Sequence, residues 1–342
     1  MAPGRVRRMD GFDWRDGDRM IHFGRGRVDQ AVELLGGPGY TLLTTARGRE
    51  AAPAAAEAAG AVHEVRAGRV DEIAGELLGV VSGDRIVALG GGRVIDTAKA
   101  LAAARRREDP AVRAMAVPTT LSGAEMTWVH RHAEGVPADT PRVRPSVVVA
   151  DPALAASQPE PELAASALNA LGHAAEAPVT RMANPVATLA AREAARLIAR
   201  AFPPGGEAEP DRDALALGAL LAGYAIDSAW YGLHHVLSQT LVRFAAVGHG
   251  PANAIMLPHT LGALAWRFPD RHDQLAEALG AEPSAFAARI CARTGATNLR
   301  ALGVDEPTLH ECADAAAERQ ELALTPPRAE RGEILALYEH AL

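Results

Sequence analysis

Lysine, cysteine and aromatic residues are scarce in this 342-residue chain. Two cysteines, Cys291 and Cys312, are too few for a disulfide framework, and nothing around them resembles a metal or redox motif. Basic residues number 35 against 42 acidic ones, and a formal charge of −7 argues against the basic surface that nucleic acid requires. We therefore expect no nucleic-acid partner and a globular protein with an aliphatic core.

Long hydrophobic segments are also missing. The longest apolar run, Ala214 to Ile226, is shorter than the roughly 20 residues that cross a bilayer, and it ends at Asp227. The charged N-terminal stretch MAPGRVRRMDGFDWRDGDRM lacks the apolar core of a secretory signal. The sequence predicts a cytoplasmic protein without a membrane partner.

Only one of the 35 basic residues is a lysine, Lys99. We attribute the use of arginine elsewhere to coding bias. A guanidinium and an ammonium group are not interchangeable at a tight site, so the one exception marks a position of interest.

The first part of the chain alternates short β-like runs with alanine-rich helical segments. The runs with strand composition are Tyr40–Thr45, Ala61–Val65, Arg85–Leu89, Ala114–Val117 and Ser146–Ala150. Helical apolar spacing marks Val28–Leu35, Val70–Val80 and Ile95–Ala104 between them. Strands separated by such helices predict a doubly wound, mostly parallel sheet.

The composition changes around the last of these strands. Before it, Val129–Pro145 is polar and proline-rich and predicts a long loop or a hairpin. After it, Asp151-Pro152 ends the strand, and the composition becomes helical. We expect an α/β nucleotide-type domain over residues 1–152 and an all-helical domain over residues 153–342. The active site is expected in the cleft between them.

A strand, three glycines and a helix follow one another in IVALGGGRVIDTAKA, residues 86–100. Gly90, Gly91 and Gly92 allow the backbone to approach a phosphate closely, and the helix start supplies N–H donors and a favourable dipole. A plain strand–turn–helix connection needs fewer glycines, so the pattern favours phosphate binding. Asp96 and Lys99 share one face of the helix and are spaced for an ion pair.

Histidines recur in the apolar helical part of the chain. Asn169 and His173 are four residues apart, His235 and Gln239 repeat that spacing, and His249 follows a glycine-rich break. A single buried histidine is most often a hydrogen-bonded core residue. Three histidines in apolar helices of one domain favour a shared site, either for a metal or for proton transfer.

These segments resemble motifs of the iron-containing alcohol dehydrogenase superfamily, which shares its fold with dehydroquinate synthase. GGGRVIDTAK is similar to its GGGSxxDxAK signature. VPTTLSGAEMT, ALNALGHAAEA, GLHHVLSQTL and PPRAER are similar to motifs of the maleylacetate reductase branch. The resemblance covers essentially the whole chain.

The resemblance implies a dehydroquinate synthase-like fold, an N-terminal dinucleotide-binding domain for NADPH or NADH, and a helical catalytic domain. Relatives reduce maleylacetate to 3-oxoadipate, so it also implies a small carboxylic acid substrate, and we expect a homodimer. It assigns cofactor binding to Thr44, Gly90, Gly91, Gly92, Arg93, Asp96, Lys99, Thr119, Thr120 and Ser122. It assigns catalysis to Asn169, His173, His235, Gln239 and His249.

Metal-dependent relatives hold iron or zinc with an aspartate and three histidines, which correspond here to Asn169, His173, His235 and His249. A neutral amide in place of the aspartate weakens binding of a divalent metal. We therefore expect metal-free chemistry, with iron or zinc on the three histidines as the alternative. Gln239 stands where relatives usually have a histidine, and an amide cannot shuttle protons.

The segment TTARGR, residues 44–49, offers no acidic side chain to repel a 2′-phosphate, and it contains Arg47 and Arg49. We expect NADPH to be accepted at least as well as NADH. Three other functions stay open: a metal-dependent alcohol or aldehyde dehydrogenase, a lyase or cyclase like dehydroquinate synthase, and a non-catalytic nucleotide-binding homologue.

Overall fold

The structure is a computed structural model that describes residues 10–204 and 209–342 and divides into two compact units. The first unit contains the described residues up to Ser157 together with Arg212–Ala216. The second contains the described residues of Gln158–Asp211 together with Leu217–Leu342. The division along the chain falls after Ser157, whereas the functional boundary after residue 152 stays a prediction.

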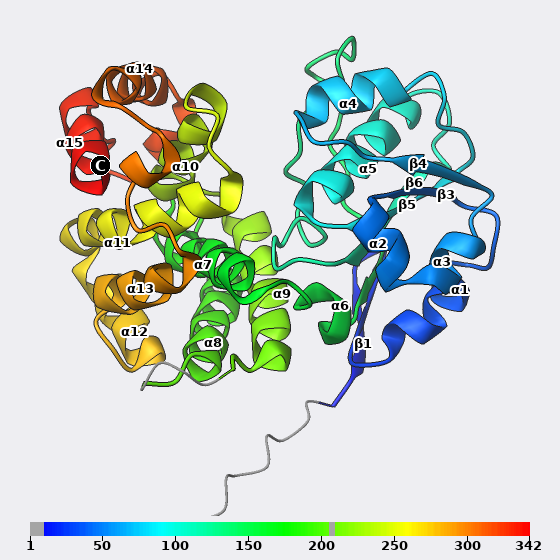
Figure 1. The fold of residues 1–342 in the computed structure, drawn as a ribbon, viewed down its shortest axis with the longest axis horizontal. Coiled ribbons are helices and arrows are strands. Elements are labelled where there is room, and N and C mark those ends of the chain that lie inside the picture. The colour runs from blue at the N-terminus through cyan, green and yellow to red at the C-terminus, as the bar shows by residue number, and fades with distance from the viewer. Residues whose placement is uncertain (1–9, 205–208) are drawn as a thin grey trace, which may run out of the picture. The chain divides into compact units, whose positions relative to one another are not determined.

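A mostly parallel seven-stranded sheet forms the centre of the first unit (Figure 1). Its order is β1(Phe12–Asp16), β2(Arg19–Phe23), β7(Val147–Ala150), β6(Arg113–Pro118), β5(Arg85–Gly90), β3(Thr41–Thr44) and β4(Ala61–Glu64). Among the pairs of these strands, β1 with β2 is antiparallel and the others are parallel. The five predicted strands and the parallel sheet are confirmed.

The hairpin of β1 and β2 was not expected from the sequence. Charged residues interrupt the apolar pattern of Phe12–Phe23, so its sequence is typical of a polar terminal segment rather than of strands. Gly17 takes a positive φ of 63° at the turn, and β2 then pairs with β7 in parallel. The hairpin therefore joins the sheet through the pairing of β2 with β7, a strand far away in the sequence, and no local pattern reveals such a pairing.

Helices cover both faces of the sheet. They are α1(Ala31–Leu34), α2(Ala46–Ala51), α3(Pro53–Glu57), α4(Val70–Leu77), α5(Gly92–Arg105) and α6(Pro152–Ala155). Alternate residues of β5 point to opposite cores: Ile86 joins the core that contains Leu101 of α5, while Val87 joins the one that contains Ala55 of α3. Burial on both faces explains why β5 reads as a continuous apolar run.

The segment Val129–Pro145 contains no helix or strand, so the loop prediction is confirmed and the hairpin alternative is wrong. The His130 side chain secures this loop, since its Nε2 accepts from the Val143 N–H at 3.2 Å and its Nδ1 lies 2.8 Å from the Arg131 carbonyl oxygen. Burial lowers the pKa of His130 to about 3, so the ring stays neutral and serves a structural purpose.

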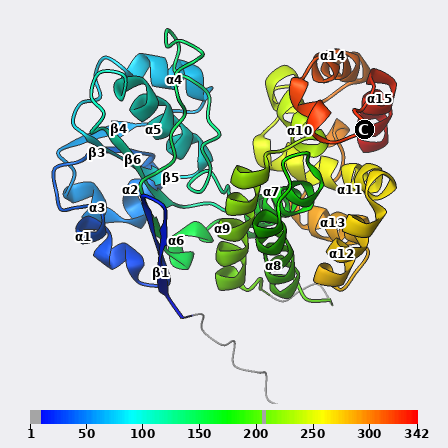
Figure 2. The ribbon, with the colours of Figure 1, turned by 180° about the vertical axis from the view of Figure 1, so that it is seen from behind.

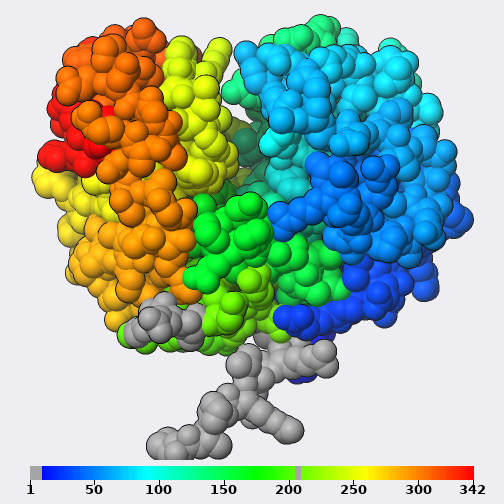
Figure 3. All heavy atoms as spheres, in the orientation of Figure 1, coloured from blue at the N-terminus to red at the C-terminus, as the bar shows by residue number. Residues whose placement is uncertain are grey.

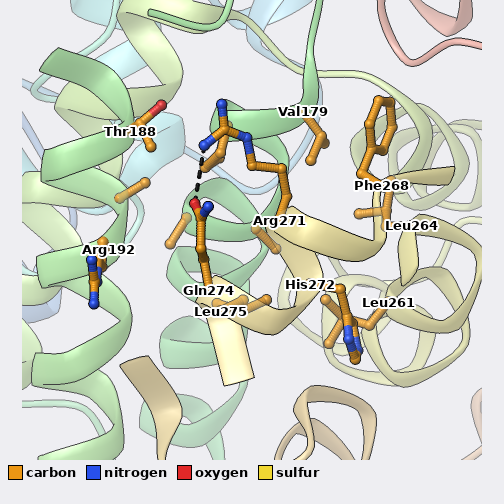
Figure 4. A pocket seen from close by; sticks show the side chains of 14 residues that line it. Val179, Thr188, Arg192, Leu261, Leu264, Phe268, Arg271, His272, Gln274 and Leu275 are labelled. Carbon is orange, nitrogen blue, oxygen red and sulfur yellow. Dashed lines mark hydrogen bonds between the residues drawn. The ribbon is translucent and has the colours of Figure 1, made fainter. Parts of the chain in front are cut away.

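The described part of the second unit contains helices and no strand, as predicted, and the first turn of its helix α9, Arg212–Ala216, belongs to the first unit (Figure 2). Its helices are α7(Glu160–Glu176), α8(Pro185–Ala201), α9(Arg212–Ala229), α10(Leu233–Phe244), α11(His249–Arg267), α12(Pro269–Leu279), α13(Pro283–Cys291), α14(Glu306–Ala317) and α15(Arg331–Ala341). The central pair, α7 and α11, pack on each other and on α10 and α13. The C-terminal helices α14 and α15, drawn in orange to red, pair at the surface of the unit (Figure 3).

None of the described helices is by itself both long and apolar enough to cross a membrane. The helices α9 and α10 reach the required length and composition only when taken together, and the chain bends by 101° between them.

Candidate active site

The glycine loop forms the turn between β5 and α5. Gly90 ends the strand, Gly91 is the N-cap, and α5 begins at Gly92 without any side chain to cap its first N–H groups. These N–H groups and the helix dipole form a site for an anion. The local structure therefore fits the phosphate-binding role predicted for this loop.

A hydroxyl-bearing segment lies directly against the glycine loop. The Thr119 N–H donates to the Gly90 carbonyl at 3.0 Å. A Cβ atom at Gly91 would lie 2.9 Å from Thr120 Cγ2, and one at Gly92 would lie 3.1 Å from Ser122 Cβ. A side chain at Gly91 would force Thr120 to shift, and one at Gly92 would crowd Ser122, so glycine suits this close approach. The structure brings these predicted cofactor residues together.

Two other predicted cofactor residues are engaged elsewhere. The buried Thr44 hydroxyl donates to the Leu89 carbonyl at 2.8 Å, which links the ends of β3 and β5. The exposed Arg93 side chain donates to the Arg66 carbonyl at 3.3 Å. Contact of Thr44 and Arg93 with a cofactor stays a prediction.

Lys99 is fully buried and forms the expected ion pair with Asp96 at 2.8 Å. Its ammonium group also donates to the carbonyls of Ala124 at 2.9 Å, Thr127 at 3.0 Å and Val129 at 2.8 Å. Except for Asp96, its ligands belong to the segment after β6, so Lys99 holds in place the continuation of the Thr119–Ser122 segment. A part for Lys99 in cofactor binding stays a prediction.

Glu125 lies in that same segment and was not predicted. Its side chain is buried, and its Oε2 atom has no hydrogen-bond partner among the described residues. Burial raises the pKa of Glu125 to about 7, against the opposing charges of Lys99 and Arg19. The glutamate is visible in the motif VPTTLSGAEMT, but no local pattern shows that a loop carboxyl group is buried.

In the second unit, His173 of α7 and His235 of α10 lie face to face. Their ring centroids are 4.6 Å apart with an interplanar angle of 18°. Burial lowers the pKa of His235 to about 3 and that of His173 well below its ordinary value. The charge of His249, the first residue of α11, contributes to both shifts, so the three predicted histidines are neighbours.

Glu176 orients His235 and was missed in the sequence. Its Oε2 accepts from His235 Nδ1 at 2.6 Å, and its carboxylate also accepts the backbone N–H groups of His234 at 2.7 Å and His235 at 3.2 Å. The carboxylate thus caps the start of α10 and fixes the tautomer of the ring. An acidic residue three positions after His173, in the last turn of an apolar helix, was the available signal.

His234 is a structural neighbour of this pair. Its Nδ1 lies 2.9 Å from Thr260 Oγ1, and its ring is completely buried, edge-on to His235 at 4.9 Å between centroids. A Cβ atom at Gly172 would come within 2.7 Å of the His234 ring. The glycine in α7 therefore makes room for the two adjacent histidines of α10.

Asn169 and Gln239 each lie one helical turn from a histidine of the stacked pair. Asn169 is buried in α7. Gln239, in α10, accepts a hydrogen bond from Arg319 Nη2 at 3.1 Å. Arg319 also contacts Glu321 through Nε and Nη2, at 3.0 and 2.9 Å, so a polar cluster that was not predicted surrounds the Gln239 amide.

Tyr231 connects that polar cluster to the histidines. Its hydroxyl donates to Glu321 Oε1 at 3.3 Å, and its ring centroid lies 5.9 Å from that of His235. Burial raises the pKa of Tyr231 to about 12, so the phenol stays protonated. The preceding Trp230 has a positive φ of 60°, a strained conformation of the kind that gathers at functional sites.

These side chains do not fit a metal ion as they are placed. Among the described residues, no group of three or more His, Cys, Asp or Glu side chains is arranged to hold one. The rings of His173 and His235 stack face to face, and Glu176 already accepts three N–H groups. Metal-free chemistry stays a prediction, and no step below involves a metal.

Comparison with known proteins matches both parts of the chain to one family. Residues 163–342 match the C-terminal model of the Fe-containing alcohol dehydrogenase family, and residues 19–152 match the model of iron-containing alcohol dehydrogenase.

Individual relatives have different names within this family. Maleylacetate reductase 1 of Rhodococcus opacus is 36% identical over 230 residues, which are 65% of this chain and 63% of that protein. 1,3-Propanediol dehydrogenase of Citrobacter freundii is 32% identical over 213 residues, or 58% of this chain and 55% of that protein. The matched region thus spans less than two thirds of either relative.

Similarity of structure extends further along the chain. The crystal structure of maleylacetate reductase from Agrobacterium tumefaciens matches with a TM-score of 0.80 at 28% identity, covering 98% of this chain and 99% of that one. Together with the two family models, this similarity shows that the chain belongs to the iron-containing alcohol dehydrogenase family, in its maleylacetate reductase branch.

Proposed function

We propose that the protein is an NAD(P)H-dependent reductase that transfers a hydride to an activated C=C or C=O bond of a small carboxylic acid, as in the reduction of maleylacetate to 3-oxoadipate. The observation that supports this most directly is the His235–Glu176 pair stacked on His173. Glu176 holds the Nδ1 proton of His235, so the Nε2 atom of this oriented, neutral ring is free to accept a hydrogen bond from a substrate or from a proton donor bound beside it.

The cofactor-binding part of the proposal rests on the first unit. The uncapped start of α5 and the close approach of Thr120 to Gly91 provide N–H and hydroxyl donors for a pyrophosphate. A bound NAD(P)H supplies the hydride. Lys99 acts at a distance, by holding in place the continuation of the Thr119–Ser122 segment.

The substrate part of the proposal rests on the second unit. Addition of a hydride to a conjugated bond leaves negative charge on the carbonyl oxygen, and that oxygen needs hydrogen-bond donors. The low pKa of His235 keeps its ring neutral at neutral pH, and because Glu176 holds its Nδ1–H, its Nε2 can only accept; the donor to the substrate oxygen would be the single N–H of the neutral His173 ring. His235 and His173 would orient the substrate, while His249, which is exposed, would exchange the proton with solvent.

The experiment that tests this function follows NADPH oxidation with maleylacetate and a panel of carbonyl and enone acids. We expect turnover with an unsaturated acid, and a loss of kcat in His235→Asn that leaves the Kd for NADPH unchanged. Cofactor binding without turnover on any of the acids would contradict the proposal and would favour a non-catalytic homologue.

A second candidate is a metal-dependent alcohol or aldehyde dehydrogenase. The similarity to 1,3-propanediol dehydrogenase supports this function. Elemental analysis and assays with simple aldehydes distinguish the two: stoichiometric, tightly bound iron or zinc with aldehyde reduction would favour the second candidate.

A further inference from the structure

An arginine-lined cavity of about 290 Å³ opens in the first unit, apart from the glycine loop and the histidines. Its charged lining consists of Asp18, Arg19, Arg106, Arg113, Arg142 and Arg144. Its volume is close to the lower end of the range for ligand pockets, roughly 300 to 1,000 Å³.

The topology of the sheet brings these residues together. The strands β2, β7 and β6 are parallel neighbours, so their amino ends meet at one edge. Arg19 opens β2, Arg113 opens β6, and Arg144 lies just before β7. Because α5 runs back across the sheet to connect β5 and β6, its C-cap, Arg106, reaches the same edge.

This edge is opposite the glycine loop, which follows the carboxyl end of β5. Six residues of strand at about 3.3 Å each place the two ends of β5 roughly 20 Å apart. A ligand in the arginine cavity is therefore distinct from a phosphate bound at the glycine loop.

The charge balance of the cavity is the reverse of that of the whole chain. Five arginines and one aspartate line the cavity, and Asp16 pairs with the buried Arg19, which leaves four exposed arginines, whereas acidic residues outnumber basic ones, 42 to 35, in the sequence. Two of these arginines have partners. Arg19 donates to the Met126 carbonyl at 3.0 Å and pairs with Asp16 at 3.0 Å, and Arg142 donates to the His130 carbonyl at 3.0 Å.

Arg106 and Arg113 differ from these in having no ion pair or hydrogen bond of the side chain with any described residue. Gathering guanidinium groups without enough acids to balance them costs free energy by mutual repulsion, which a bound anion would relieve. Guanidinium groups also match phosphate oxygens in a two-point geometry.

We propose that this cavity binds a small polyanion with two or three linked phosphate groups. Arg106 and Arg113 would supply the principal contacts, and the other arginines would supply additional positive charge. This inference does not depend on the reductase function, since none of its residues belongs to the glycine loop or the histidine cluster.

The test uses the full chain and inorganic tripolyphosphate, with binding measured by calorimetry at constant ionic strength. We expect one saturable site per chain and a Kd raised about tenfold or more in the double variant Arg106→Gln/Arg113→Gln. Arg107→Gln is the matched control, because Arg107 is an exposed neighbour that does not line the cavity, and its Kd should stay within about twofold of wild type.

Three outcomes would overturn the proposal: no saturable binding, an equal loss of affinity in the control, or an unchanged Kd in the double variant, which would place the anion at the glycine loop. A dicarboxylate of similar length serves as a second probe, and tighter binding of it than of tripolyphosphate would contradict the phosphate assignment. Circular dichroism of each unliganded variant verifies folding.

Discussion

The Arg319 guanidinium donates from Nη2 to the side-chain oxygen of Gln239 over 3.1 Å and thereby fixes which end of the amide faces the guanidinium. The same Nη2 lies 3.4 Å from the Tyr231 hydroxyl, beside the stacked histidines. Family resemblance predicts a histidine at position 239. The Arg319 guanidinium explains why an amide fits at this position, because the Gln239 side-chain oxygen accepts a hydrogen bond from the guanidinium without adding a second positive charge beside it.

We predict that Gln239→His is folded but destabilised by about 1 kcal/mol, because the hydrogen bond from Arg319 is weakened. The adjacent guanidinium charge should lower the pKa of the new imidazole and keep it neutral. Urea unfolding and the pH profile of kcat test this. In Gln239→His/Arg319→Met the charge is gone, and the profile should gain an ionisation near the ordinary histidine pKa; identical profiles for both variants would contradict the idea.

Glu176→Gln should reduce kcat about 10- to 100-fold, because the amide cannot accept all three N–H groups and no longer fixes His235. We also expect a stability loss of about 2 kcal/mol from an unpaired buried donor. Steady-state kinetics and urea unfolding measure the two effects. Glu321→Gln is the matched control for charge removal and should retain the His235 geometry. A kcat in Glu176→Gln equal to that of wild type would show that Glu176 only caps α10.

Lys99→Arg should destabilise the protein by about 2 to 4 kcal/mol, because the larger planar guanidinium cannot replace an ammonium group enclosed by three carbonyl oxygens and the Asp96 carboxylate. Thermal and urea unfolding measure the change. Arg107→Lys, the reverse exchange at an exposed position just after α5, should alter stability by less than about 0.5 kcal/mol. If both substitutions are neutral, coding bias alone accounts for the distribution of lysine.

Glu125 should make stability decrease with rising pH. Its folded pKa is raised to about 7 from an ordinary value of 4.5, so its contribution is fully present below pH 4.5 and is lost as the pH rises through 7. A shift of this size corresponds to about 3 kcal/mol. Glu125→Gln should therefore gain stability relative to wild type between pH 5 and pH 8, as measured by urea unfolding. A constant difference between the two proteins over this range would refute the assignment.

NADPH should be used at least as efficiently as NADH, because residues 44–49, which run from the end of β3 into α2, contain no acid and include Arg47 and Arg49. Comparison of kcat/KM for the two cofactors tests this. Arg49→Gln should reduce the preference several-fold by lowering affinity for the 2′-phosphate. A value for NADH about tenfold or more above that for NADPH would contradict the prediction.

The sequence predicts the sheet well because its strands are short apolar runs bounded by helices. Arg85–Leu89 and Ala61–Val65 were placed to within one residue of β5 and β4. The hairpin of β1 and β2 was missed because its register depends on β7, which lies more than 120 positions along the chain. The short helices α2 and α3 were also missed, since six and five residues carry little periodic signal.

For the candidate site, spacing could predict that histidines share helix faces, but not how their rings meet. Whether His173 and His235 converge on an ion or stack depends on the packing of α7 against α10. Glu176 acts through helix capping across that contact, and Arg319 approaches Gln239 from a segment 80 residues away. Such partners are set by tertiary packing, which a single sequence does not encode in any local pattern.

The burial of Lys99 has a practical consequence for chemistry in solution. Since this sequence has no other lysine and the Lys99 ammonium group is inaccessible, the folded chain offers amine-selective reagents no side-chain target. Acylation at that position requires the loop between Ala124 and Val129 to separate from α5. The rate of labelling at one atom, read by mass spectrometry, would therefore report how often that part of the protein opens.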